Sequence, residues 1–232
     1  MAFGTPTSTK KQSTDNTNVT SDAIDTTGYD LIIIGIATAV AGAANPTDSK
    51  GNTWTPLTGQ GAGDVFARFW YCIAPTVGSG HTFSTSQSGT YPSIFVLAIA
   101  GAAVAGFDQQ NGAASASATT LQPGSVTPSE DNELVVTLVT NNDLLNTLSV
   151  NGGFTVAQQA VTVAFQAEGG GLAYLIQTSL AAANPTWSWG GGSLAVAAVI
   201  ATFKAAGAVA IVFDWMSGPA LITYPKPEIV SY

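Results

Sequence analysis

The stretch DLIIIGIAT, residues 30–38, is an apolar run that opens with an acid and is dominated by isoleucine. A second stretch, ELVVTLVTN at residues 133–141, has the same form. Similar short runs rich in Val, Ile, Thr and aromatic residues recur along the chain, separated by Gly, Pro, Asn and Asp. The charged residues that coat ordinary amphipathic helices are scarce. Many short strands with turns between them predict an all-β sandwich or barrel.

The order and spacing of these runs repeat in the two halves of the chain. The interval from Leu31 to Tyr71 equals the interval from Leu134 to Tyr174, and both tyrosines are followed by an aromatic residue between hydroxyl residues. An ancient duplication, two sheets built from the same succession of strands, or a chance match of period-2 strands would each give this pattern. The expected strands are residues 29–37, 65–74, 81–86, 93–101, 133–141, 154–163, 171–180, 185–189 and 193–204.

We expect both halves to lie in one domain, because each half alone would leave an apolar face open. The prediction is a single antiparallel β-sandwich of jelly-roll type over residues 1–204, built from two similar halves at about 29–101 and 133–204. A polar Ser/Thr/Gly/Pro connection, residues 107–131, joins the halves and has room for an extended edge strand. Residues 205–232 form a C-terminal extension.

The chain carries little charge. Charged residues make up 9% of the sequence, with a formal net charge of −8, against about 25% charged residues in typical soluble proteins. So few cations argue against binding to nucleic acid or to an anionic membrane. The apolar run 194–213 is long enough to span a bilayer, but Lys204 lies at its centre, where a charge costs about 2.5–3.5 kcal/mol. We therefore expect two β-segments there, separated by a turn near 204–207.

His81 is the sole histidine and Cys72 the sole cysteine. These two residues cannot form a structural zinc site, and one cysteine cannot form an intramolecular disulfide. We expect His81 to be a partly exposed strand residue and Cys72 to be a buried thiol. The sequence contains no nucleotide-binding loop and no nucleophile elbow. We therefore expect no enzyme activity, no catalytic residues, no metal site and no cofactor.

The acidic residues cluster in turns, which leaves few candidates for acid–base chemistry. Glu168 adjoins an apolar strand, and together with Asp64 it is the pair that a hydrolase alternative would use. The segments 48–52 and 129–133 supply oxygen atoms of the kind that calcium prefers. Lys50 lies inside the first of these segments, and structural turns are the favoured interpretation of both.

Tryptophans are the candidates for a sugar-binding surface. Trp54, Trp187 and Trp189 would serve if exposed, although packing in the core is the commoner fate of such residues. The turn that carries Trp54 has a counterpart around Phe154 in the second half, and the shared feature is the aromatic residue. We predict that Trp54 and Phe154 both point into the core.

Four motifs together resemble a known module. They are DSKGNTWT (48–55), FWYCIAPTVGSGHTFS (69–84), SEDNELVV (129–136) and the closing strand that ends in ATFK (201–204). In this order they resemble a β-sandwich module of phage virion structural proteins and bacterial surface proteins, and the likeness extends over about residues 29–204. The resemblance implies a structural or adhesive part of a virion or cell surface, and it brings no catalytic residues with it.

The resulting functional expectation is a non-enzymatic phage virion structural protein, either a head decoration or a tail or fibre component. Its partners would be other virion proteins and copies of itself, in a homo-oligomer. The N-terminal residues 1–16 lack the apolar region of a secretory signal, so we expect synthesis in the host cytoplasm and location in the virion. The alternative is a receptor- or carbohydrate-binding module whose partner is a host-surface glycan.

The C-terminal extension is rich in both aromatic residues and proline. Prolines deny it a long helix or a central strand. One interpretation is a docking arm that adds a strand to a neighbouring subunit; the other is a segment that packs along its own sandwich. The candidate partner-binding residues are Phe213, Trp215, Met216, Tyr224 and Tyr232.

Overall fold

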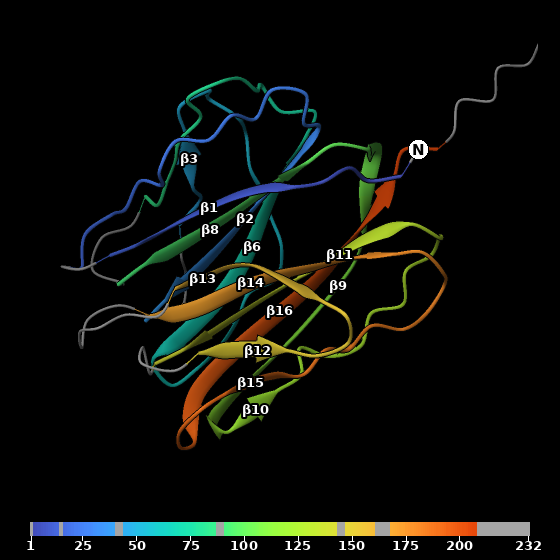
Figure 1. Ribbon diagram of the computed structural model, residues 1–232. Coiled ribbons are helices and arrows are strands. Elements are labelled where there is room, and N and C mark those ends of the chain that lie inside the picture. Colours follow the sequence, from blue (N-terminus) through green and yellow to red (C-terminus); the bar gives the residue numbers. More distant parts are fainter. Residues whose placement is uncertain are drawn as a thin grey trace, which may run out of the picture.

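The computed structural model describes residues 2–13, 16–39, 44–86, 91–142, 147–160 and 168–207, and the regular structure in these ranges is entirely β. Two large antiparallel sheets form the centre, and a small sheet flanks each of them (Figure 1). The first large sheet contains β1 (Thr7–Gln12), β8 (Ser93–Ile99), β2 (Leu31–Thr38), β6 (Val65–Ile73), β4 (Thr55–Pro56) and β5 (Gln60–Ala62). The second contains β9 (Ala102–Ala118), β16 (Leu194–Ala205), β11 (Glu133–Asn141), β14 (Gly169–Gln177) and β13 (Thr155–Ala160).

The two small sheets use the shortest strands. One pairs β3 (Thr47–Asp48) with β7 (Phe83–Ser84). The other has the order β10 (Thr120–Leu121), β15 (Trp187–Trp189) and β12 (Leu148–Val150). Within the described ranges no helix is long and apolar enough to cross a bilayer. The run that begins at Leu194 forms strand β16 up to Ala205.

Each half of the chain builds one large sheet, and the two sheets have the same strand order. The order β1-β8-β2-β6-β4 in the first half corresponds strand by strand to β9-β16-β11-β14-β13 in the second. The register agrees as well, since Thr55 pairs with Tyr71 and Thr155 pairs with Tyr174. The prediction of an all-β sandwich with two similar halves is confirmed. Each half of the chain forms one large sheet. In the expected jelly roll, the two sheets are formed by two Greek keys.

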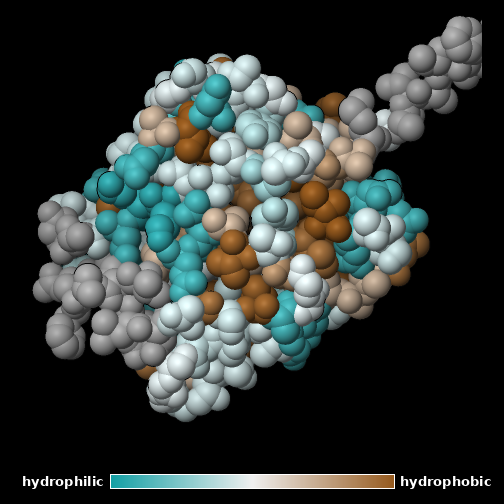
Figure 2. All heavy atoms as spheres, in the orientation of Figure 1, coloured by the Kyte–Doolittle hydropathy of each residue, from teal (hydrophilic) through white to brown (hydrophobic). Residues whose placement is uncertain are grey.

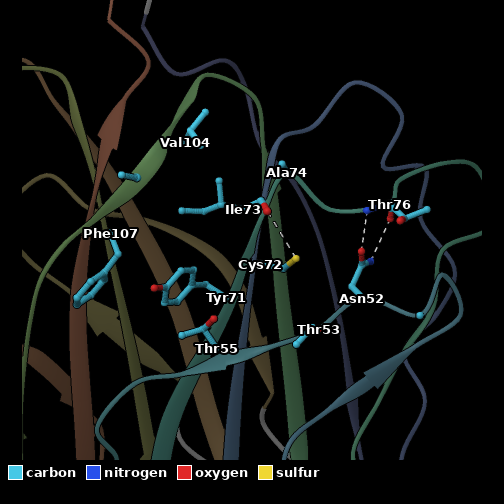
Figure 3. A pocket seen from close by; sticks show the side chains of 12 residues that line it. Asn52, Thr53, Thr55, Tyr71, Cys72, Ile73, Ala74, Thr76, Val104 and Phe107 are labelled. Atoms are coloured by element: carbon cyan, nitrogen blue, oxygen red, sulfur yellow. Dashed lines mark hydrogen bonds between the residues drawn. The ribbon is translucent and has the colours of Figure 1, made fainter.

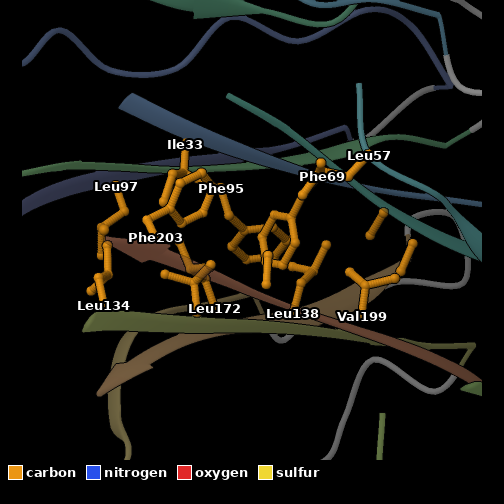
Figure 4. Packing of buried hydrophobic residues seen from close by; sticks show 14 of the residues in the cluster. Ile33, Leu57, Phe69, Phe95, Leu97, Leu134, Leu138, Leu172, Val199 and Phe203 are labelled. Carbon is orange, nitrogen blue, oxygen red and sulfur yellow. The ribbon is translucent and has the colours of Figure 1, made fainter. Parts of the chain in front are cut away.

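The central strands are buried on both faces, which explains their unbroken apolar runs. β2, β8 and β11 have every residue buried. Between the large sheets lies the main core (Figure 4), where Phe69 and Phe95 of the first sheet meet Leu138 and Phe203 of the second. Each large sheet also packs on its outer face, away from the main core. The small sheets and neighbouring loops cover separate apolar clusters there.

Strands at the flanks connect the two halves. The side chains of Ser8 and Lys10 in β1 donate hydrogen bonds to carbonyl oxygens of β13. On the other flank, Thr58 N–H donates to Oε1 of Gln110 in β9 at 2.7 Å. β9 occupies part of the polar connection, so the expected room for an edge strand there is used.

Both ends of the described chain reach the same turn between β8 and β9. Gly4 N–H donates to the carbonyl oxygen of Ala100 at 2.9 Å, and Ala206 N–H donates to that of Gly101 at 2.7 Å. Figure 1 shows the N-terminal segment beside the end of β16. Residues 208–232, and with them all five candidate partner-binding residues, lie outside the described ranges.

Candidate functional site

The loop before β4 is organised around a buried carboxylate. Asp48 Oδ1 accepts hydrogen bonds from His81 Nε2 at 2.9 Å and from the Lys50 backbone N–H at 2.8 Å. Its Oδ2 accepts from Trp54 Nε1 and from the Asn52 backbone N–H, both at 3.0 Å. Because these oxygens already accept N–H donors, Asp48 is not placed as a calcium ligand, and the turn interpretation of residues 48–52 is supported.

His81 is fully buried, so the prediction of a partly exposed strand residue is wrong. Its Nδ1 lies 2.9 Å from Thr26 Oγ1, and its Nε2 faces the Asp48 carboxylate. A carboxylate only accepts, so Nε2 carries the proton. Phe83 stacks on the imidazole with ring centroids 4.2 Å apart. These partners satisfy both ring nitrogens inside the protein, which removes the reason for exposure.

Thr26, His81 and Asp48 form a hydroxyl–imidazole–carboxylate series, the residue types of a hydrolase triad. A triad needs its hydroxyl open to substrate, but the side chains of Thr26, His81 and Asp48 have no exposed surface. Thr26 Oγ1 also accepts from Gly78 N–H at 3.0 Å. The arrangement therefore ties three segments together and presents no nucleophile.

Glu168 and Asp64 are the pair of the hydrolase alternative, and the charge of Asp64 acts on the Glu168 carboxyl. Burial, and then the negative charge of Asp64, raise the pKa of the Glu168 carboxyl to about 8. Its Oε2 has no hydrogen-bond partner in the described part of the chain. Neither residue lines either of the two grooves described below. The structure thus places a neutral carboxyl group here, outside both grooves of the described ranges.

The three candidate sugar-binding tryptophans are all buried. The prediction that Trp54 points into the core is confirmed, and it packs in the outer cluster of the first half. Phe154 is half-buried and packs against both outer clusters of the second half. Cys72 is only partly buried, whereas the sequence predicts a buried thiol, because it lies near the end of β6, beyond the last residue that β4 pairs.

Two grooves occupy equivalent places in the two halves. Groove one, of about 760 Å³, is lined by residues from 51–55, 71–76 and 104–107 (Figure 3). Groove two, of about 530 Å³, is lined by residues from 151–154, 175–179 and 181–185. None of the residues that line them is charged. Both lie over the last residues of a middle strand, β6 or β14.

The floor of groove one is an unpaired strand edge. Leu57 N–H donates to the Phe69 carbonyl oxygen at 2.9 Å, so Phe69 faces the β4 side of β6. Alternate residues of an antiparallel strand face the same neighbour, which directs the N–H and C=O of Ile73 to that side as well. β4 pairs only as far as Tyr71, and no described strand pairs with Ile73 across this edge; the Ile73 carbonyl oxygen accepts a hydrogen bond from Cys72 Sγ at 3.9 Å. Ile176 occupies the equivalent position in groove two.

This edge is open because the incoming chain leaves it. Residues 51–54 turn away from the sheet to place Trp54 in the outer cluster, and the strand begins to pair only at Thr55. Around Phe154 the second half does the same, and pairing begins at Thr155. The aromatic residue shared by the two turns therefore creates the groove beside it.

The wall of groove one is partly aromatic. Tyr71 stacks on Phe107 with centroids 5.6 Å apart, and the side chain of Val104 is 90% exposed on β9. On the rim, the Asn52 side chain is fully engaged, because Nδ2 donates to Asp48 Oδ1 and Oδ1 accepts from Thr76 N–H at 2.6 Å. An uncharged groove beside unpaired backbone groups is suited to an extended peptide.

Comparisons with protein-family models, with curated proteins and with solved structures find no match to this chain. Within the described ranges, no group of three or more His, Cys, Asp or Glu residues could hold a metal ion. No pattern in the sequence marks Ile73, Ile176 or Val104 as groove residues, because an open edge depends on where a distant segment leaves the sheet.

Proposed function

We propose that this chain is a non-enzymatic phage virion structural protein, either a head decoration or a tail or fibre component, that works by packing against other virion proteins and copies of itself. The pair of uncharged grooves beside unpaired strand edges supports this most directly. Unpaired edges are templates for pairing with another chain, and here they are short and repeated. The motifs at 48–55 and 69–84 resemble a virion β-sandwich module. Both motifs supply residues that line groove one.

The surface chemistry also supports assembly through uncharged contacts. Figure 2 shows one face of the molecule, where pale and hydrophilic residues surround patches of apolar ones. Short Ser, Thr, Asn and Gln side chains lose less conformational freedom on packing than long charged ones. Such a surface suits close and repeated contacts between subunits.

Antibody labelling of intact particles tests the proposed role. The expected result is regular labelling of the head or of the tail, with the purified chain forming oligomers in sedimentation equilibrium. A chain that is absent from particles and monomeric at all concentrations would overturn the proposal.

Ile176→Pro removes the open N–H of groove two and should weaken self-association by about tenfold, the value of one hydrogen bond. Ile176→Val keeps that N–H and serves as the matched control.

A receptor- or carbohydrate-binding module is the second candidate. The observation in its favour is the aromatic wall of groove one, where Tyr71 and Phe107 stand beside the hydroxyl and amide groups of the rim. Retention of the chain on an array of host-surface glycans, lost in Tyr71→Ala, would favour this function over the first.

A further inference from the structure

We infer that Asn111 is a site of spontaneous deamidation, and that its conversion to aspartate or isoaspartate loosens residues 124–127, which lie beside β9. This inference does not depend on the virion role. It concerns a covalent change that the chain's own groups carry out together with one water molecule. The sequence has two Asn-Gly pairs, Asn111–Gly112 and Asn151–Gly152, and the structure distinguishes them.

An asparagine followed by glycine loses ammonia without an enzyme. The backbone nitrogen of the glycine forms a bond to the side-chain Cγ while the bond from Cγ to Nδ2 breaks. The departing nitrogen takes up the backbone proton and leaves as ammonia. The resulting cyclic imide adds one water molecule and opens at either carbonyl, which gives aspartate or isoaspartate. Glycine favours the attack because it has no Cβ atom to crowd its nitrogen.

Asn111 has the geometry that this reaction needs. It is exposed on β9, which is the edge strand of the second large sheet. The Gly112 N–H donates to Oδ1 of the Asn111 side chain at 2.8 Å. Because Oδ1 is bonded to Cγ, this contact holds the attacking nitrogen next to the carbon that it must reach. The Nδ2 that would leave donates to the Ser125 carbonyl oxygen at 2.9 Å.

Packing requires a glycine at position 112. An added Cβ atom would clash with Cγ of Gln60 in β5 and would lie 3.1 Å from the Ala198 carbonyl oxygen in β16. The place where β9 meets the first large sheet therefore keeps the reactive pair in the chain, and no bulkier residue can shield the nitrogen.

Asn151 is exposed as well, but its side chain has a different partner. Its Oδ1 accepts from Thr186 N–H at 2.7 Å, and its own backbone N–H donates to the Thr186 carbonyl oxygen at 3.2 Å. These two bonds direct the side-chain amide towards Thr186. A hydrogen bond must therefore break before the Gly152 nitrogen can attack, so this second pair should react more slowly.

The reaction at Asn111 removes a contact that joins two segments. An aspartate there has no Nδ2 donor, so a carboxylate oxygen would face the Ser125 carbonyl oxygen, and neither group can donate. Beside this contact, Gln109 Oε1 accepts from Thr127 N–H at 3.0 Å. Isoaspartate would also insert a methylene group into the backbone where Asn111 pairs with Ile200 of β16. Both products therefore loosen the polar connection beside β9.

Mass spectrometry of the full-length chain tests the site. The protein is kept at mildly alkaline pH and digested with pepsin at acidic pH, and each Asn-Gly peptide is followed for the mass change from amide to acid. The same incubation in urea gives the rates of the unfolded pairs, by which the folded rates are divided. We expect this ratio to be about tenfold larger for Asn111 than for Asn151, the value of one hydrogen bond. Equal ratios, a larger ratio for Asn151, or no reaction at Asn111 in the folded protein would overturn the inference.

Two aspartate variants test the consequence. Asn111→Asp loses the donor to Ser125, whereas Asn151→Asp adds the same charge and keeps its accepting oxygen. Amide hydrogen exchange over residues 124–127 should become about tenfold faster in the first variant and stay unchanged in the second. Equal exchange in the two variants would show that the Asn111 side chain does not hold this segment, and would overturn the second half of the inference.

Discussion

Asp48 is a side chain on which an entire loop depends. Its two oxygens accept hydrogen bonds from Lys50, Asn52, Trp54 and His81, and its side chain has no exposed surface. Asp48→Ala leaves buried donors without partners. We expect a loss of about 3–5 kcal/mol in the free energy of unfolding, the usual cost of breaking a buried pair, measured by urea denaturation.

Asp22 provides the control for that substitution. It forms an ion pair with Lys11 at 3.2 Å, but on the surface. Exposed pairs contribute little, so Asp22→Ala should leave the urea midpoint almost unchanged. Equal effects of Asp22→Ala and Asp48→Ala would contradict the structural role given to the buried carboxylate.

Glu168 gives stability a dependence on pH. Its pKa is about 8 in the folded protein, against an ordinary value of 4.5. Between these values the folded state keeps a proton that the unfolded state has lost, so stability falls as the pH rises from 4.5 to 8 and is level above. One such group contributes a slope of about 1.4 kcal/mol per pH unit.

Glu168→Gln isolates this contribution. Thermal unfolding of the parent and of the variant should agree near pH 4.5, and the variant should become the more stable of the two as the pH approaches 8. A difference between the two proteins that stays constant across this range would show that Glu168 does not keep its proton in the folded state.

For single residues, the sequence predicts burial where the packing partners are close along the chain. The repeat of its turn around Phe154 predicts that Trp54 lies in the core. No such pattern predicts the burial of His81, because it depends on Thr26 and Asp48, which lie 55 and 33 positions away. Nothing in the strand pattern around His81 signals that these two partners meet it.

Among the elements, β2 and β11 make a close approach at Gly35. A Cβ atom added there would lie 3.0 Å from a methyl carbon of Leu138 and 3.2 Å from the Phe69 ring. Gly35→Ala should therefore force the two sheets apart, at a cost of about 1–3 kcal/mol for overpacking. Chemical denaturation measures it. Gly192→Ala, where an added Cβ meets nothing within 4 Å, should have little effect.

The strands themselves were the most predictable elements. Strands buried on both faces leave long apolar runs, so β2, β8, β11 and β16 were expected close to their actual bounds. The two-residue strands β3 and β4 were missed, because their pairing is decided by the segments they meet. The grooves were missed for the same reason, since a strand edge is open or closed only in three dimensions.

The whole molecule should unfold in one step. Its main core takes residues from both large sheets, so the loss of either half exposes the inner face of the other. We expect a single calorimetric transition whose van't Hoff and calorimetric enthalpies agree. Asp48→Ala in the first half and Trp187→Phe in the second, which removes the hydrogen bond to Thr137, should lower that same transition. Two separate transitions would show that the halves fold independently.

The backbone N–H groups of Gly4 and Ala206 donate hydrogen bonds to consecutive residues, Ala100 and Gly101, so the first and last parts of the described chain lie close together. In a variant that lacks residues 207–232, a short linker between residues 4 and 206 would close the backbone into a ring, which could then be opened in the connection near residue 123 to give a circular permutant. The same geometry allows the whole body to be spliced into an exposed loop of another protein with little disturbance to its host.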